Sequence, residues 1–69
     1  MKLRQVDSEM LLAAGYDRRS RILQVIFRTG ETYRYKQVPL LKYAGLMSAD
    51  SKGKYMHRHI IGHYDYERV

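Results

Sequence analysis

The chain has 69 residues and no cysteine, with 45% hydrophobic and 29% charged residues, so we expect one small folded domain without disulfides or thiolate metal sites. No apolar run approaches the roughly 20 residues of a membrane span, and the N-terminus lacks the apolar core of a signal peptide, so a cytoplasmic protein with no membrane partner is expected. The 13 Lys and Arg against 7 Asp and Glu give a net charge of +6, which favours polyanionic partners, although small domains also carry such charge for solubility alone.

The first two predicted strands are residues 10–16, which are apolar, and residues 21–28, in which apolar side chains alternate with polar ones. Residues 17–20 between them read Asp-Arg-Arg-Ser, and the Asp and Ser side chains favour a turn. A four-residue loop would place Ala14 opposite Leu23 and Leu12 opposite Val25. This register predicts one apolar face.

A second hairpin is predicted around Gly30, because glycine suits the left-handed last position of a three-residue loop. With residues 28–30 as the loop, Val25 faces Tyr33 and Leu23 faces Tyr35. A two-residue loop would shift the register by one residue and mix the faces. The three-residue loop is therefore the preferred prediction.

In the third strand, Tyr33 and Tyr35 point to one face, and Arg34 and Lys36 point to the other. Exposed rings would form a stacking platform for unpaired bases. The preferred register instead turns them toward the core and leaves the cations outside. Both interpretations of the tyrosines stay open at this point.

Two helices are predicted after Pro39, which suits a first helical turn. The first carries an apolar stripe at Leu40, Tyr43, Ala44 and Met47 and contains Gly45, which would permit a close approach. The second runs over residues 52–61, with N-cap candidates before it, Gly62 after it, and a buried face at Tyr55, Met56, His59 and Ile60.

The predicted fold class is therefore α+β: a small three-stranded antiparallel meander followed by two helices on one face, with room for a short extra strand at a terminus. We expect one domain over residues 1–69, with a core at about residues 6–61 and a C-terminal strand or tail at residues 62–69.

Several short motifs, in their order along the chain, resemble the KTSC domain family, named after the C-terminal extension of some lysyl-tRNA synthetases. The resemblance covers about residues 6–61 and rests on Val6-Asp7-Ser8, Gly15-Tyr16-Asp17, Tyr33-Arg34-Tyr35, Val38-Pro39 and Ser51-Lys52-Gly53-Lys54-Tyr55. It implies a small α+β domain, for which the synthetase association suggests RNA binding. Two departures are Met56-His57, where relatives often carry Phe-Asn, and Arg18-Arg19, where Pro and an acid are common.

The start of the second helix is the strongest candidate for ligand contact, because free N–H groups, lysines and a serine there could hold a phosphate. The alternative is a capped helix whose Gly53 packs against the sheet. The candidate residues are Ser51, Lys52, Lys54, Tyr55 and Arg58.

A basic strip is the second candidate, since arginine forks suit phosphate, although a run of charge is usually only a solvated face. It comprises Arg18, Arg19, Arg21, Arg28, Arg34 and Lys36. No cofactor or metal is expected, because Gly62 should separate His59 from His63 and sulfur ligands are missing. No catalytic residue is predicted either, since neither a nucleophile with a base nor paired carboxylates are recognisable.

These residues predict a small non-catalytic module that binds nucleic acid, RNA rather than DNA, through phosphate contacts. The alternative is a protein-interaction module that docks a partner through a sheet edge or the Leu46-Met47 end of the first helix.

Overall fold

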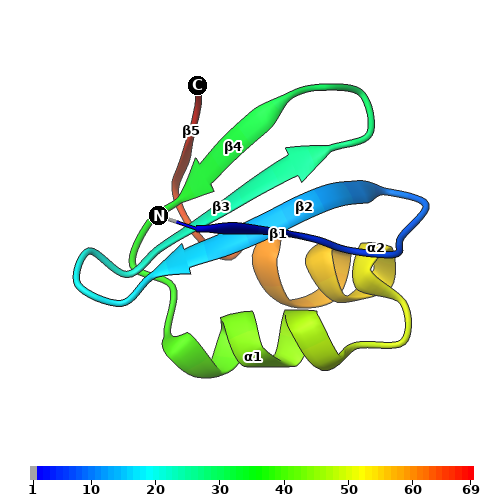
Figure 1. The fold of residues 1–69 in the computed structure, drawn as a ribbon. Helices are drawn as coiled ribbons and strands as arrows, with labels where there is room; N and C mark the ends of the chain where they lie inside the picture. Colours follow the sequence, from blue (N-terminus) through cyan, green and yellow to red (C-terminus); the bar gives the residue numbers. More distant parts are fainter. Residues whose placement is uncertain (1) are drawn as a thin grey trace.

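The computed structural model describes residues 2–69, which form a five-stranded antiparallel sheet in chain order with all helices on one face (Figure 1). Both termini run along edge strands of the sheet. The elements are β1 (Leu3–Gln5), β2 (Leu11–Asp17), β3 (Ile22–Phe27), β4 (Thr32–Tyr35), α1 (Leu40–Ser48), α2 (Lys52–Tyr55), the π-helical turn η1 (Met56–Ile60) and β5 (Tyr66–Arg68).

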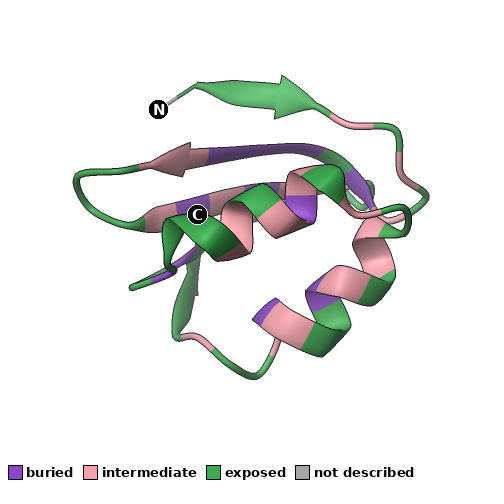
Figure 2. Ribbon diagram, turned by 90° about the horizontal axis from the view of Figure 1, so that it is seen from below, coloured by how far each residue is buried: buried purple, intermediate pink, exposed green. Residues whose placement is uncertain are grey.

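The core lies between the helices and the central strands, where Figure 2 shows the buried segments of β2, β3, α1 and η1 facing one another. Burial of these apolar side chains is the main source of stability in so small a domain. The fully buried members of this core are Leu11, Ala14, Leu23, Val25, Tyr35, Val38, Leu46, Met56 and Ile60.

The prediction of three strands is wrong, because β1 and β5 extend the meander on both sides. All residues of β1 and β5 are exposed, so neither strand has the alternation of apolar and polar side chains that marks a half-buried strand. These edge strands are held mainly by backbone pairing to β2 and β4, and such pairing leaves no pattern in the sequence.

The second hairpin is confirmed, whereas the predicted register of the first is wrong. Leu23 lies opposite Tyr35 and Val25 opposite Tyr33, and Gly30 has the left-handed φ of 96°. In the first hairpin, however, Ala14 pairs with Val25. A register shift between Leu11 and Ala13 moves Leu12 out of the core, so that Leu11 is buried in its place.

Helix α1 packs through part of the predicted stripe, since Tyr43 and Met47 lie against the core. Leu46 is its fully buried residue, whereas Leu40 and Ala44 are exposed. The Tyr43 ring stacks on Tyr16 of β2 with the ring centroids 5.3 Å apart. Leu40 and Ala44 were wrongly predicted to face the core and Leu46 was not, because the Pro39 start did not fix how the helix is rotated on the sheet.

The second predicted helix is confirmed as a continuous run of α2 and η1. The Ser51 hydroxyl accepts a hydrogen bond from the Lys54 N–H at 3.3 Å, and Gly62 follows the helix with a φ of 83°. A wider turn, in which the Ile61 N–H donates to the Met56 carbonyl, closes the helix. Met56 is fully buried on the predicted inner face.

Gly45 of α1 permits the predicted close approach, and its neighbour is the Tyr55 ring. A Cβ at this position would lie 2.9 Å from Tyr55 Cζ, which is closer than real Cβ contacts. The Tyr55 ring of α2 thus packs directly on the α1 backbone at Gly45.

Candidate nucleic-acid interface

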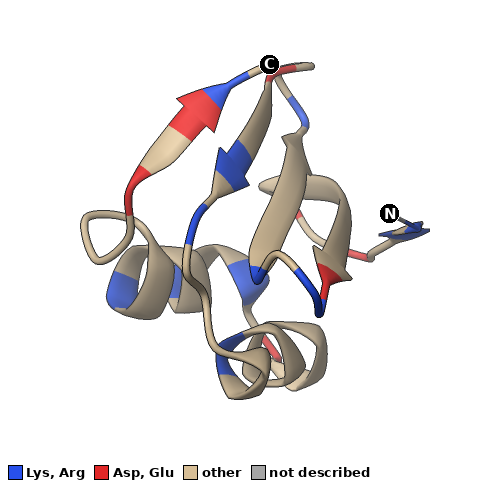
Figure 3. Ribbon diagram, turned by 90° about the vertical axis from the view of Figure 1, so that its left-hand side faces the viewer, with Lys and Arg blue, Asp and Glu red and all other residues tan. Residues whose placement is uncertain are grey.

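Cations gather at the end of the sheet where the β2–β3 turn meets the connection from β4 to α1. Arg18, Arg19 and Arg21 are exposed on the turn, and Lys36 is exposed on the connection. The two segments are tied by the Val38 N–H, which donates to the Arg21 carbonyl at 2.9 Å. Figure 3 shows lysine and arginine segments at this turn and beyond the end of β4. We call these four cations the basic end.

Asp17 holds the turn that presents these arginines. Its carboxylate accepts hydrogen bonds from the Ser20 hydroxyl at 2.8 Å and from the Arg19 N–H at 3.1 Å. These bonds, the Ser20 hydroxyl first, lower the pKa of Asp17 below its ordinary value. The Arg21 N–H donates to the Asp17 carbonyl, and Arg21 itself has a left-handed φ of 58°. The carboxylate of Asp17 is therefore bonded within the turn and stabilises its shape.

Arg34 lies on the sheet face opposite the helices and is exposed. Its Nε donates to Gln24 Oε1 on β3 at 2.9 Å, so the guanidinium is held flat along the open face. The tyrosines on either side point toward the helices, and Tyr35 is buried. The register therefore puts the cation outside and the rings inside.

The helix start does not act as one site, because its predicted residues line two different hollows. One hollow, of about 210 Å³, is lined by Ser51, Lys54, Tyr55 and Arg58 together with Ala49 and His59. Lys54 and Arg58 are exposed at its rim, and no carboxylate is among the residues that line it. This part of the predicted site is suited to an anion.

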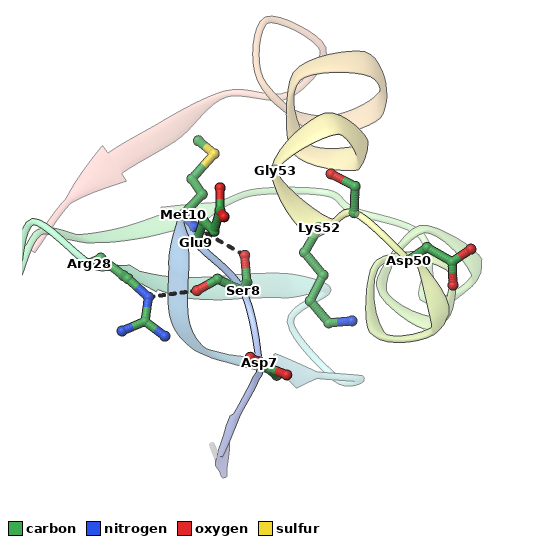
Figure 4. A pocket seen from close by; sticks show the side chains of 9 residues that line it. Asp7, Ser8, Glu9, Met10, Arg28, Asp50, Lys52 and Gly53 are labelled. Atoms are coloured by element: carbon green, nitrogen blue, oxygen red, sulfur yellow. Dashed lines mark hydrogen bonds between the residues drawn. The ribbon is translucent and has the colours of Figure 1, made fainter.

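Lys52 instead lines a larger cleft of about 720 Å³ between the start of α2 and the β1–β2 loop (Figure 4). Its Nζ donates to the Ala49 carbonyl at 3.0 Å. The cleft is also lined by three carboxylates, of Asp7, Glu9 and Asp50. The mixed charge makes it a poorer phosphate seat than the sequence suggested.

Two motifs from opposite ends of the chain meet in this cleft, which sequence reasoning did not anticipate. The Ser8 hydroxyl accepts from the Met10 and Leu11 N–H groups at 3.1 and 3.2 Å, and Arg28 Nε donates to the Ser8 carbonyl at 2.6 Å. Gly53 faces this loop, since a Cβ there would lie 3.3 Å from Met10 Sδ. Gly53 is thus a packing position, but its neighbour is the β1–β2 loop and not, as the alternative interpretation had it, the sheet.

His59 is held between an aromatic ring and a lysine side chain. Within residues 2–69, no group of three or more His, Asp or Glu side chains is placed to hold a metal ion. His59 packs on the Tyr55 ring, and its Nδ1 lies 3.2 Å from Lys42 Nζ. Burial, followed by the charges of Lys42, Arg58 and His63, lowers the pKa of His59. The neutral ring accepts a hydrogen bond from the ammonium group.

An aromatic hollow on the helix side of the sheet was also missed. Phe27, Tyr33, Tyr35 and Tyr66 line about 560 Å³ together with Met10 and Ile61. Burial, with smaller contributions from Tyr33 and Tyr66, raises the pKa of Tyr35 to about 12. Because residues 62–69 were predicted as either a strand or a tail, Tyr66 was not assigned to a face.

Comparison with known proteins connects this geometry to a family. The family model of the KTSC domain matches residues 7–64. An uncharacterised protein of Stutzerimonas stutzeri is 37% identical over 70 residues, covering 100% of this chain and 99% of that protein. The crystal structure of a KTSC domain protein from Yersinia pestis superposes with a TM-score of 0.96 at 34% identity, covering 99% of this chain and 96% of that one.

A lysine–tRNA ligase of a Nostoc species is also similar, with 33% identity over 63 residues. The match covers 91% of this chain but only 11% of the ligase, so it concerns a small part of that enzyme. None of the helices within residues 2–69 is long and apolar enough to cross a membrane.

Proposed function

We propose that this chain, which belongs to the KTSC domain family, is a non-catalytic module that binds RNA through its phosphate backbone. The observation that carries the proposal is the basic end, where Arg18, Arg19, Arg21 and Lys36 are exposed together. Arginine and lysine side chains that are free of ion pairs neutralise phosphates and release counterions. Within residues 2–69 the recorded ion pair is Arg68 with Glu31, far along the sheet from these four.

The hollow at Lys54 and Arg58 is a second cationic surface, on α2 and η1. It has two exposed cations and no carboxylate lining, and Lys42 of α1 reaches toward it through its contact with His59. Lys52 is left out of the proposed interface, because it is surrounded by acids in the other cleft.

The preference for RNA over other polyanions rests on the relatives. One similar protein is a lysine–tRNA ligase, whose name identifies tRNA as its substrate. That activity belongs to the whole enzyme, of which this chain resembles a small part. A module that adds phosphate contacts to a tRNA-binding protein is consistent with both observations.

The test is a titration of the chain with labelled tRNA, single-stranded RNA and duplex DNA at two salt concentrations. If about four phosphates are contacted, the logarithm of the affinity for a single strand falls with the logarithm of the salt concentration with a slope of about 3. Tighter binding to the RNAs than to the duplex DNA is expected. Absent binding, or binding that does not depend on salt, would refute the proposal.

A further inference from the structure

The aromatic hollow ends at an exposed ring on the edge of the sheet. The Tyr33 and Tyr66 rings are parallel within 6° with centroids 5.0 Å apart, and Phe27 meets Tyr33 edge to face. One face of the Tyr66 ring is thus covered by Tyr33. Tyr66 is nevertheless 55% exposed, because β5 is the last strand of the sheet. A further flat or apolar side chain would continue this row.

The backbone beside that ring is also unpaired. The Lys36 N–H donates to the Asp65 carbonyl, and the Val69 N–H donates to the Thr32 carbonyl. In an antiparallel pair the bonded residues alternate, so Glu67 faces β4 while the backbone N–H and C=O groups of Tyr66 and Arg68 point away from the sheet. β5 therefore presents two donors and two acceptors to an additional strand.

A second copy of the chain is a poor occupant of this edge. Antiparallel pairing of β5 with itself can use three registers, and each sets like charges directly opposite each other. Tyr66 against Arg68 places Glu67 on Glu67, Tyr66 against Tyr66 places Glu67 on Asp65, and the third places Arg68 on Arg68. Like charges in directly opposite positions destabilise a strand pair. The charges of β5 therefore disfavour antiparallel pairing with the β5 strand of a second copy.

RNA is a poor occupant as well, because the hollow has no excess of cations. Glu9, Glu31 and Arg28 line it, and Arg68, on the same face of β5 as Tyr66, pairs with Glu31. Two carboxylates thus balance two guanidinium groups, in contrast to the basic end. On the other face of β5, Glu67 lies between Arg34 of β4 and the open edge, where it can attract a cationic side chain.

We propose that β5 receives an extended peptide segment of a partner protein as a sixth strand of the sheet. The segment runs antiparallel to β5, lays an aromatic or aliphatic side chain on the free face of Tyr66, and sets a lysine or arginine opposite Glu67. An acidic residue opposite Arg68 completes the match. This interaction surface is separate from the proposed RNA interface and does not depend on it.

The experiment uses the whole ¹⁵N-labelled chain and a blocked synthetic peptide of sequence Ser-Thr-Glu-Lys-Tyr-Thr-Ser at millimolar concentration. Its Glu, Lys and Tyr would lie opposite Arg68, Glu67 and Tyr66. We expect slower hydrogen exchange of the Tyr66 and Arg68 amides, since these are the ones that gain carbonyl partners. Unchanged exchange of both amides would overturn the proposal.

Two matched pairs make the result specific. N-methylation of the peptide Tyr removes a donor that points at β5 and should weaken binding roughly tenfold, whereas N-methylation of its Lys, whose N–H points away, should not. Glu67→Lys should weaken binding about two- to fivefold, and a peptide with Glu in place of its Lys should restore it. Equal loss with both methylations would overturn strand pairing.

An oligouridine serves as the competing ligand. Shifts at Tyr66 caused by oligouridine and not by the peptide would assign the hollow to RNA and overturn the proposal.

Discussion

Neutralising two side chains of the basic end gives the sharpest test of the RNA interface. The double variant Arg19→Gln with Lys36→Gln removes two exposed cations. It leaves the backbone bonds of these residues in place, from the Arg19 N–H to Asp17 and from the Lys36 N–H to the Asp65 carbonyl. The fold should therefore be unchanged, with the thermal midpoint close to that of the original chain.

The expected loss of affinity follows from counterion release. Each phosphate contact to a single strand contributes about 0.7 to the salt slope, so losing two lowers the slope by about 1.4. At a salt concentration of about 0.1 M the same two contacts are worth about 1.4 decades, or roughly a 25-fold weaker binding. Fluorescence anisotropy of a labelled single-stranded RNA over a series of salt concentrations measures both quantities.

A matched control separates a site from a general charge effect. Arg4→Gln with Arg68→Gln removes the same charge from the two edge strands, β1 and β5, where no RNA contact is proposed. Its binding should fall much less and its slope should change little. A loss as large as that of the basic-end variant would refute the proposed interface, because net charge alone would then explain the binding.

Three further predictions concern stability. Gly45→Ala should not raise the free energy of unfolding by the usual helix gain of about 1 kcal/mol, because the new Cβ meets the Tyr55 ring. Chemical unfolding should show that gain when the chain also carries Tyr55→Leu. A gain from Gly45→Ala alone would contradict the contact. Because the pKa of His59 is lowered, the stability that its neutral ring contributes is present above pH 6.5, its ordinary pKa, and declines as the pH falls below that value. The thermal midpoint should therefore fall between pH 7.5 and 5. A flat midpoint, or a decline of the same size in His59→Asn, would argue against the Lys42 contact. Burial raises the pKa of Tyr35 to about 12 from 10, so the contribution of its neutral hydroxyl to stability is present below pH 10. That contribution is lost as the pH rises toward 12, by up to about 2.7 kcal/mol. Alkaline unfolding of Tyr35→Phe that is as strong as that of the original chain would contradict this.

Local chemistry made some of the fold predictable. Gly30 fixed a three-residue loop, and the loop fixed which residues of β3 oppose Tyr33 and Tyr35. Ser51 and Gly62 marked the ends of the second helix because capping depends on a single side chain and on a single left-handed residue. The α+β class followed from these pieces, and so did the outward position of Arg34.

The first hairpin was less predictable because its turn has no glycine. Arg21 takes the left-handed position, so the loop lies one residue later than its composition suggests. The bulge that exchanges Leu12 for Leu11 depends on packing against the helices, which no local pattern encodes. The same holds for the roll of α1 that buries Leu46.

The sequence by itself determined a small basic α+β domain with a positively charged turn and a capped helix start, and it favoured inward-facing tyrosines on β4 without deciding between the two faces. Only the tertiary structure decided how these features combine. It divided Lys52 from Lys54, because positions two apart on a helix point in different directions, and it placed Lys52 in a cleft with acids of the β1–β2 loop. It also created the β5 edge and its exposed ring, since an edge strand is held by backbone bonds to a distant segment and needs no hydrophobic pattern of its own.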